Sequence, residues 1–410
     1  MDDDLDVTAY WIAEELPPAM RVLHHLHGGI GVDVTYPLHR YSSTAKDLAR
    51  LIGGASYRLD LVGAGVHRSD RRAARAAGGT AGLFRGPHLP PEEAAIMRTE
   101  RHGPPTYREV IRRMGKDGWL GVGWPKEFGG RGFGEIEQQI FANEAVRADV
   151  PLPSVTLQTV GPTLQVYGTE EQKRKFLPAI LAGEVHFAIG YSEPEAGTDL
   201  AALRTSAVRD GDTYIVNGQK IFTTGGHDAD YIWLAVRTGA ADSRHRGISI
   251  LIVDTTDPGF TWTPIITCDG AHHVNATYYS DVRVPANMLV GEENRGGWKL
   301  ITTQLNHERV MLGPAGKVGG LYDHVSEWAK ANDLLGEPDV RRALGEIHAT
   351  FRLNELLNWQ VAASESEAVD IADARQPRCS PPNASSGSGA SRRRSSAVTA
   401  IPPIPPPVSC

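Results

Sequence analysis

The sequence is short of cysteine: Cys268, Cys379 and Cys410 are the only three among 410 residues, and none belongs to a CxxC pair. This scarcity excludes a zinc knuckle and a disulfide framework, and it is typical of a reducing compartment, so we expect a cytoplasmic protein. The chain also lacks an apolar run long enough to cross a bilayer. Its acidic start, MDDDLDVTAY, has no apolar segment of the kind found in signal peptides.

An excess of basic residues is missing as well. The 42 Lys and Arg are outnumbered by 49 Asp and Glu, which gives a formal net charge of −7. We therefore expect no nucleic-acid partner, because no broad basic surface is available for phosphates. No GxGxxG segment stands between a predicted strand and a predicted helix, which argues against a Rossmann site. The length predicts a soluble protein of about two or three domains.

Helical patterns stand on both sides of a region with strand periodicity. Residues 95–186 carry apolar stripes at helical spacing, and TEEQKRKFLPAILAG opens with Thr169 as an expected N-cap. In residues 187–290 the period is two, in segments such as DTYIVNGQKIFTT, YIWLAVRT, RGISILIVD, FTWTPI and ATYYSDVRV. Strands without intervening helices predict an antiparallel barrel or sandwich. Residues 291–368 return to helical spacing.

The two ends of the chain interrupt this order. Residues 1–64 are predicted to be helical around the loop HHLHGGIGVDVTYPLHRY, and residues 65–94 have the Arg, Ala and Gly content of a linker. Residues 369–410 are of low complexity, rich in Ser, Pro and Arg, so we expect them to be disordered. We expect no metal site, because the histidines of the loop lack carboxylate or Cys partners at ligand spacing.

Four ordered motifs resemble those of the acyl-CoA dehydrogenase family. FAIGYSEPEAGTD (187–199) resembles the loop that lies along the flavin, and NGQKIFTT (217–224) resembles a strand segment that follows it. GWLGVGWPKEFGG resembles the N-terminal helical domain, and SDVRVPANMLVGEENRG resembles the junction after the β-domain. The resemblance implies an α+β multidomain fold with an N-terminal helical domain, a middle antiparallel β-domain and an incomplete C-terminal helical bundle. The subgroup that it resembles comprises actinobacterial enzymes acting on steroid side-chain CoA thioesters.

The resemblance implies FAD-dependent α,β-dehydrogenation of an acyl-CoA to the 2-enoyl-CoA, in fatty acid or steroid side-chain β-oxidation. A base takes the α-proton, and a carboxylate in an apolar cleft suits that role. The family places this base at one of two positions, and LNHER (305–309) resembles the earlier one. Glu308 is therefore the expected base, with Arg309 beside it in the site. A charge pair on a solvated helix face is the alternative interpretation.

By the same resemblance, two segments are expected to hold the cofactor. Hydroxyls and backbone N–H groups at Tyr191, Ser192 and Thr198 can meet flavin heteroatoms and the pyrophosphate, whereas an ordinary polar turn is the alternative. Phe222 can lie against the isoalloxazine, and Thr224 can reach its N5/O4 edge. Without the resemblance, Phe222 would be interpreted as core and Thr224 as a surface strand residue.

The N-terminal loop resembles a C-terminal segment of the same family, in which a His-Gly-Gly-x-Gly loop contacts the FAD of a neighbouring subunit. Gly28 and Gly29 are therefore also expected to bring backbone N–H groups near the cofactor. This order of segments is expected from a tandem protein, a gene fusion or a frameshift. The early glycine loop would then replace a late one, as in a circular permutation.

The resemblance also implies an electron-transfer flavoprotein as acceptor and a homo- or hetero-oligomer with another acyl-CoA dehydrogenase subunit. The family's Arg-x-x-Phe-Gly motif is not visible between Gly313 and Glu365, which favours a heteromeric partner. Three alternatives stay open. They are an inactive truncated or frameshifted copy, a non-catalytic subunit of a heteromer, and an acyl-CoA oxidase whose reduced flavin reacts with dioxygen.

Overall fold

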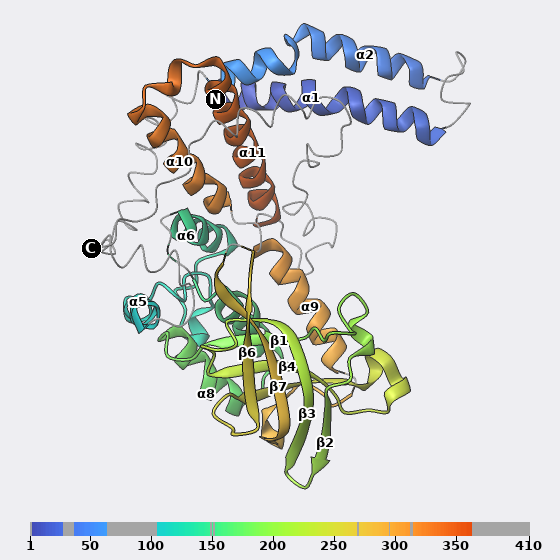
Figure 1. Ribbon diagram of the computed structural model, residues 1–410, viewed down its shortest axis with the longest axis vertical. Coiled ribbons are helices and arrows are strands. Elements are labelled where there is room, and N and C mark those ends of the chain that lie inside the picture. Colours follow the sequence, from blue (N-terminus) through green and yellow to red (C-terminus); the bar gives the residue numbers. More distant parts are fainter. Residues whose placement is uncertain are drawn as a thin grey trace. The chain divides into compact units, whose positions relative to one another are not determined.

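The structure is a computed structural model, shown in Figure 1, and its described residues form two units. Of these residues, unit 1 contains those before residue 64 together with 318–356, and unit 2 contains those from 105 to 317 together with 357–362. The described ranges are 2–27, 37–63, 105–147, 150, 152–268, 270–294, 296–311 and 315–362.

Unit 2 begins with helices that cover one face of a sheet. They are α5 (Pro105–Lys116), α6 (Glu135–Arg147), α7 (Gly161–Tyr167) and α8 (Glu170–Leu181), with the π-helical stretch η3 (Val155–Val160) before α7. The expected N-cap of α8 is confirmed as a capping box. Thr169 Oγ1 accepts from the Gln172 amide at 3.2 Å, and Gln172 Oε1 accepts from the Thr169 amide at 3.1 Å.

The middle of unit 2 is an eight-stranded sheet with the order β6-β7-β3-β2-β4-β5-β8, and β1 lies beside β4. Most neighbouring strands are antiparallel, as the alternating pattern predicts. The pairing of β1 with β4 is parallel, and so is the single pair Ser206–Arg237 between β2 and β4. The strands are β1 (Phe187–Gly190), β2 (Ser206–Asp210), β3 (Thr213–Thr224), β4 (Tyr231–Arg237), β5 (Ile248–Asp254), β6 (Phe260–Ile266), β7 (His272–Pro285) and β8 (Leu289–Val290).

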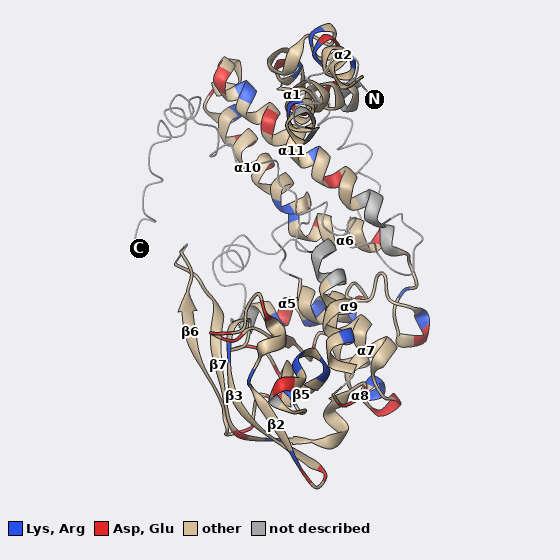
Figure 2. Ribbon diagram, turned by 90° about the vertical axis from the view of Figure 1, so that its right-hand side faces the viewer, with Lys and Arg blue, Asp and Glu red and all other residues tan. Residues whose placement is uncertain are grey.

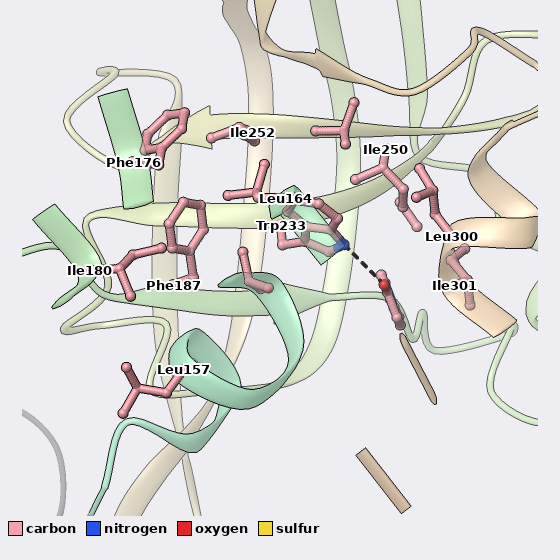
Figure 3. Packing of buried hydrophobic residues seen from close by; sticks show 14 of the residues in the cluster. Leu157, Leu164, Phe176, Ile180, Phe187, Trp233, Ile250, Ile252, Leu300 and Ile301 are labelled. Atoms are coloured by element: carbon pink, nitrogen blue, oxygen red, sulfur yellow. Dashed lines mark hydrogen bonds between the residues drawn. The ribbon is translucent and has the colours of Figure 1, made fainter. Parts of the chain in front are cut away.

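Strand β4 is buried on both faces. Trp233 and Ala235 belong to the hydrophobic cluster shared with the helices, whereas Ile232, Leu234 and Val236 belong to the cluster on the opposite face. A strand covered on both sides has a continuous apolar sequence, which explains why YIWLAV shows no polar alternation. Figure 3 shows Trp233 between the sheet and helix α9 (Gly296–Met311), which contributes Leu300 and Ile301 to this cluster.

Unit 1 joins the first helices of the chain to the last ones. They are α1 (Asp2–His27), α2 (Leu38–Leu51), a helical stretch at 54–63, α10 (Ala315–Ala331) and α11 (Pro338–Ala362), of which α10 and α11 lie mostly in this unit. Val7, Tyr10, Val62 and Ala349 form one buried cluster. Trp11 Nε1 donates to the Ala349 carbonyl at 3.3 Å. The N-terminal helices therefore share a core with α11 of the same chain.

Charges of both signs occur along the described helices and strands, as Figure 2 shows by colour. Within the described ranges, no helix is both long and apolar enough to cross a membrane. In the same part of the chain, no group of three or more His, Cys, Asp or Glu side chains is arranged to hold a metal ion.

Candidate functional site

The two predicted cofactor segments lie side by side where β1 and β3 end. The Ile221 amide donates to the Ser192 carbonyl at 2.9 Å, and Lys220 Nζ donates to the Tyr191 carbonyl at 3.1 Å. The loop after β1 is thus attached by backbone and side-chain bonds to the strand that carries Phe222. The structure brings together two motifs that the sequence separates by about twenty residues.

A buried ion pair fixes this loop. Lys220 Nζ lies 2.8 Å from Glu193 Oε1, and their side chains are 0% and 8% exposed. The Glu193 carboxylate also accepts from the backbone amides of Arg204 at 2.7 Å and Thr205 at 2.9 Å. A buried pair whose remaining lone pairs are also hydrogen-bonded is the arrangement that a low-dielectric interior tolerates. Glu193 therefore ties the loop after β1 to Lys220 of β3 and to the backbone of Arg204 and Thr205.

The charges of this pair are set by burial and by mutual attraction. Burial raises the pKa of Glu193, but the charge of Lys220 and the hydrogen bonds from Lys220, Thr205 and Arg204 outweigh it, so the net pKa is lowered from 4.5. Burial lowers the pKa of Lys220 to about 8, although the charge of Glu193 opposes the shift. Both groups are consequently charged at neutral pH.

Phe222 and Thr224 are exposed on strand β3. The Phe222 side chain is 63% exposed, and the residue has a left-handed φ of 61°. This conformation coincides with a shift in the pairing of β3 with β7 between Lys220 and Thr223, because a bulge turns the strand locally. Thr223 is fully buried, while its two neighbours are exposed. An exposed aromatic ring in an uncommon backbone conformation makes Phe222 a candidate contact for a ligand.

These residues fit a flat redox cofactor. The ring of Phe222 offers an apolar face, the Thr224 hydroxyl can donate or accept beside it, and the rigid loop at Ser192 supplies backbone polar groups. Ser192 is half-buried and Thr198 is exposed, so both can reach a ligand at the surface of the loop. Ser192, Thr198, Phe222 and Thr224 are thus all at least partly exposed, as a contact with a cofactor requires.

The side chain of Tyr191 has a different environment. It is 7% exposed, and its hydroxyl accepts a hydrogen bond from Trp233 Nε1 at 3.1 Å and donates one to Gln304 Oε1. The hydroxyl is therefore engaged in the core, and its expected contact with a cofactor stays a prediction. Gln304 lies 113 positions further along the chain, so no local sequence pattern connects it with Tyr191.

The predicted base lies in a helix that packs on the sheet. Glu308 and Arg309 belong to α9, which is anchored by the buried side chains of Leu300 and Ile301. The side chains of Glu308 and Arg309 lie outside the described residues, and so do Gly28 and Gly29. Lys220, by contrast, fixes the loop after β1, and the motifs alone did not single it out. Its signal is a lone cation at an inward position of β3, on the same side as Tyr214 and Val216.

Three family models match the chain in order. They are described as acyl-CoA dehydrogenase, N-terminal domain, over residues 80–184; acyl-CoA dehydrogenase, middle domain, over residues 188–282; and acyl-CoA dehydrogenase, C-terminal domain, over residues 295–376. The two cofactor segments fall in or beside the middle-domain match, and Glu308 falls in the third.

Individual relatives agree with these models. The chain is 70% identical over 291 residues to acyl-CoA dehydrogenase FadE29 of Mycobacterium tuberculosis, which covers 70% of this chain and 74% of the relative. The solved structure named Tcur3481-Tcur3483 steroid ACAD is 50% identical, with a TM-score of 0.67 over 74% of this chain and 78% of its own. The ChsE4-ChsE5 complex from Mycobacterium tuberculosis is 49% identical, with a TM-score of 0.65 over 72% and 77%.

Proposed function

Because the chain belongs to the acyl-CoA dehydrogenase family, whose members are FAD-dependent oxidoreductases acting on CH–CH bonds, we propose that it oxidises a steroid side-chain acyl-CoA to the 2-enoyl-CoA. The observation that carries this proposal is the exposed pair Phe222 and Thr224 beside the loop fixed by Glu193 and Lys220. Similarity to the Tcur3481-Tcur3483 steroid ACAD supports the steroid-derived acyl group.

In this mechanism the protein binds and orients the cofactor, and it deprotonates the acyl-CoA thioester. Ser192 and Thr198 would hold the polar edge of the cofactor, and the Phe222 ring would lie against its apolar face. Glu308 is assigned to accept the α-proton of the thioester, because a carboxylate placed in an apolar cleft is a stronger base. Arg309 is assigned to the same site as a neighbouring positive charge. When bound, the flavin supplies the acceptor for the β-hydride.

The proposal also includes the N-terminal helices, a second subunit and an electron acceptor. Residues 1–64 take the place of the late helices of the C-terminal bundle, with Gly28 and Gly29 near a cofactor; the shared core of Val7, Val62 and Ala349 supports this. A second acyl-CoA dehydrogenase subunit completes the assembly, and similarity to the ChsE4-ChsE5 complex supports such a heteromer. An electron-transfer flavoprotein reoxidises the flavin.

The test is the visible spectrum of the purified chain after FAD is added and the excess removed. We expect flavin bands that bleach anaerobically with a steroid side-chain acyl-CoA and that return with an acceptor dye. Glu308→Gln should retain the bands but stop the bleaching. Glu327→Gln serves as the matched control, because that side chain is 76% exposed on α10.

Three outcomes would contradict the proposal in different ways. A colourless protein would favour a non-catalytic subunit or an inactive copy, and adding the partner subunit would separate these two. Reoxidation of the reduced flavin by dioxygen as fast as by the dye would indicate an acyl-CoA oxidase. Full bleaching by Glu308→Gln would remove Glu308 from the base role.

A further inference from the structure

One face of strand β7 is both polar and buried. Asn275, Thr277 and Tyr279 alternate along the strand, and all three side chains are almost completely buried. Thr277 Oγ1 lies 3.2 Å from the Tyr279 hydroxyl and 3.2 Å from Thr223 Oγ1 of β3. A buried polar network holds one arrangement, because a group that loses its partner there cannot turn to water. The network therefore fixes the side chain of Thr223, the residue next to Phe222.

Strand β3 leaves its regular pairing with β7 just before this point. The register shifts between Lys220 and Thr223, so that Ile221 and Phe222 lie opposite a single residue of β7. The Ile221 amide donates to the Ser192 carbonyl at 2.9 Å. The bulge thus brings β3 to the loop after β1, and the strand rejoins β7 directly after Phe222.

The side chain of Asn275 forms the junction at which β3 rejoins β7. Its Nδ2 donates to the Thr223 carbonyl at 3.2 Å, and that carbonyl also accepts from the Gly226 amide at 3.3 Å. A carbonyl can only accept, so the NH₂ group of Asn275 has to face Thr223. His227 Nδ1, 2.9 Å from Nδ2, then accepts, and His272 Nε2, 2.8 Å from Oδ1, donates. Both N–H groups of the amide are used.

Three aromatic rings pack around the bonds of Asn275. The rings of His227 and His272 are stacked with their centroids 4.4 Å apart, and the Trp262 ring lies 5.7 Å from each of them. These three side chains are partly exposed, whereas Asn275 is fully buried. Hydrogen bonds kept from water in this way are stronger than bonds at the surface. The bond from Asn275 to the Thr223 carbonyl is therefore well placed to hold the backbone.

We propose that Asn275 is a positioning residue for the cofactor. By holding the Thr223 carbonyl, it fixes the left-handed backbone of Phe222 on one side and the exposed Thr224 on the other. A left-handed conformation is unfavourable for an aromatic residue, so it persists only where its surroundings impose it. The inference rests on the proposed function, in which Phe222 and Thr224 contact the flavin.

The test is a fluorescence titration of FAD with the full chain and with Asn275→Leu, which keeps the size of the side chain but removes its three hydrogen bonds. We expect the dissociation constant for FAD to rise about tenfold, because the Phe222 ring is no longer prearranged. Tyr279→Phe is the matched control on the same face of β7. It removes one buried hydrogen bond, so it should lower thermal stability but leave the dissociation constant unchanged.

A double-mutant cycle separates positioning from a general loss of stability. If Asn275 acts through Phe222, Asn275→Leu should raise the dissociation constant by less than about threefold in the Phe222→Ala background, where the ring that it positions is absent. A merely structural role would give the same rise in both backgrounds. Asn275→Asp replaces Asn275→Leu if that variant fails to fold. It keeps the acceptor for His272 but has no donor for the Thr223 carbonyl, so the same rise is expected.

An unchanged dissociation constant in the Asn275 variants would overturn the proposal, and so would an equal rise in the Phe222→Ala background. Failure of the unsubstituted chain to bind FAD would overturn the proposed function, and this inference with it. If the chain binds FAD and bleaches with the acyl-CoA while the Asn275 variants bind FAD equally well, the proposed function stands and only the role of Asn275 fails.

Discussion

The two units of this protein bury their apolar side chains in different ways. In unit 2, strands β4 and β5 are closed on both faces, and large side chains such as Trp233 and Phe176 are almost completely buried. In unit 1 the described clusters are small, and Leu26 and Leu51 are 73% and 85% exposed. The sheet carries a dense core beneath a prearranged site, whereas the helices from the two chain ends depend on a few contacts. This contrast predicts that the units respond separately to substitution.

Trp233→Ala tests the densely packed core of unit 2, and it has the largest expected effect. Removing a fully buried indole leaves a cavity and strips Tyr191 of a donor, so the free energy of unfolding of unit 2 should fall by about 3–5 kcal/mol. Hydrogen exchange in urea, followed segment by segment, measures it. Protection should fall in β4 and β5 but stay constant in α1 and α11. An equal fall in both units would show that they unfold as one.

The sequence predicted the parts of unit 2 that depend on local pattern. The segments proposed as strands coincide with β3, β4, β5, β6 and β7, because period-two alternation and turn residues act over a few positions. Two features of the sheet were not predicted from the sequence. β1 is only four residues long, and its parallel pairing with β4 joins segments more than forty residues apart. Such pairing is decided by packing rather than by propensity.

In the candidate site, too, the local features were predicted and the long-range contacts were not. Phe222 and Thr224 were predicted on one segment, and both are exposed there. The partners that hold the loop were not predicted, because Lys220 meets Glu193 across 27 positions, and Tyr191 meets Gln304 across 113. Motif likeness identifies the loop, but only the three-dimensional arrangement shows what keeps it rigid.

Lys220→Met probes that rigidity. The substitution leaves the buried Glu193 carboxylate without its cation, so we expect a loss of about 3 kcal/mol in the unfolding free energy of unit 2, reduced by the amides of Arg204 and Thr205. FAD affinity should fall with it, because the loop at Ser192 loses its anchor. Urea unfolding and a flavin titration measure the two effects. An unchanged stability would mean that the pair does not fix the loop.

The pH dependence of the unfolding free energy tests the role of Lys220 independently. The pKa of Lys220 is lowered from 10.5 to about 8, so between these values the folded chain has released a proton that the unfolded chain still holds. The unfolded state then binds more protons, and the contribution of Lys220 to the unfolding free energy rises with pH across this window. The Lys220→Met variant should lack this rise. Glu193 acts on the acid side: its stabilisation is present above 4.5 and is lost as pH falls through its lowered pKa.

Gly63→Ala tests the smaller core of unit 1, and it has the smallest expected effect. A Cβ at Gly63 would lie 2.5 Å from the Arg341 carbonyl oxygen, and backbone cannot give way as a side chain can. The stretch 54–63 must therefore move off α11, which we expect to lower the unfolding free energy of unit 1 by about 1–3 kcal/mol. Gly336→Ala is the matched control, because a Cβ there meets nothing within 4 Å.

The FAD affinity of Gly63→Ala decides what the first helices do. If Gly28 and Gly29 contact a cofactor, loosening the helix that follows them from α11 should weaken FAD binding, while hydrogen exchange in β3 and β4 stays unchanged. If the dissociation constant for FAD equals that of Gly336→Ala, the first helices serve only to cover apolar surface on α11. The flavin site would then depend on unit 2 for all the contacts that this chain provides, and the difference between the units would be one of function as well as of packing.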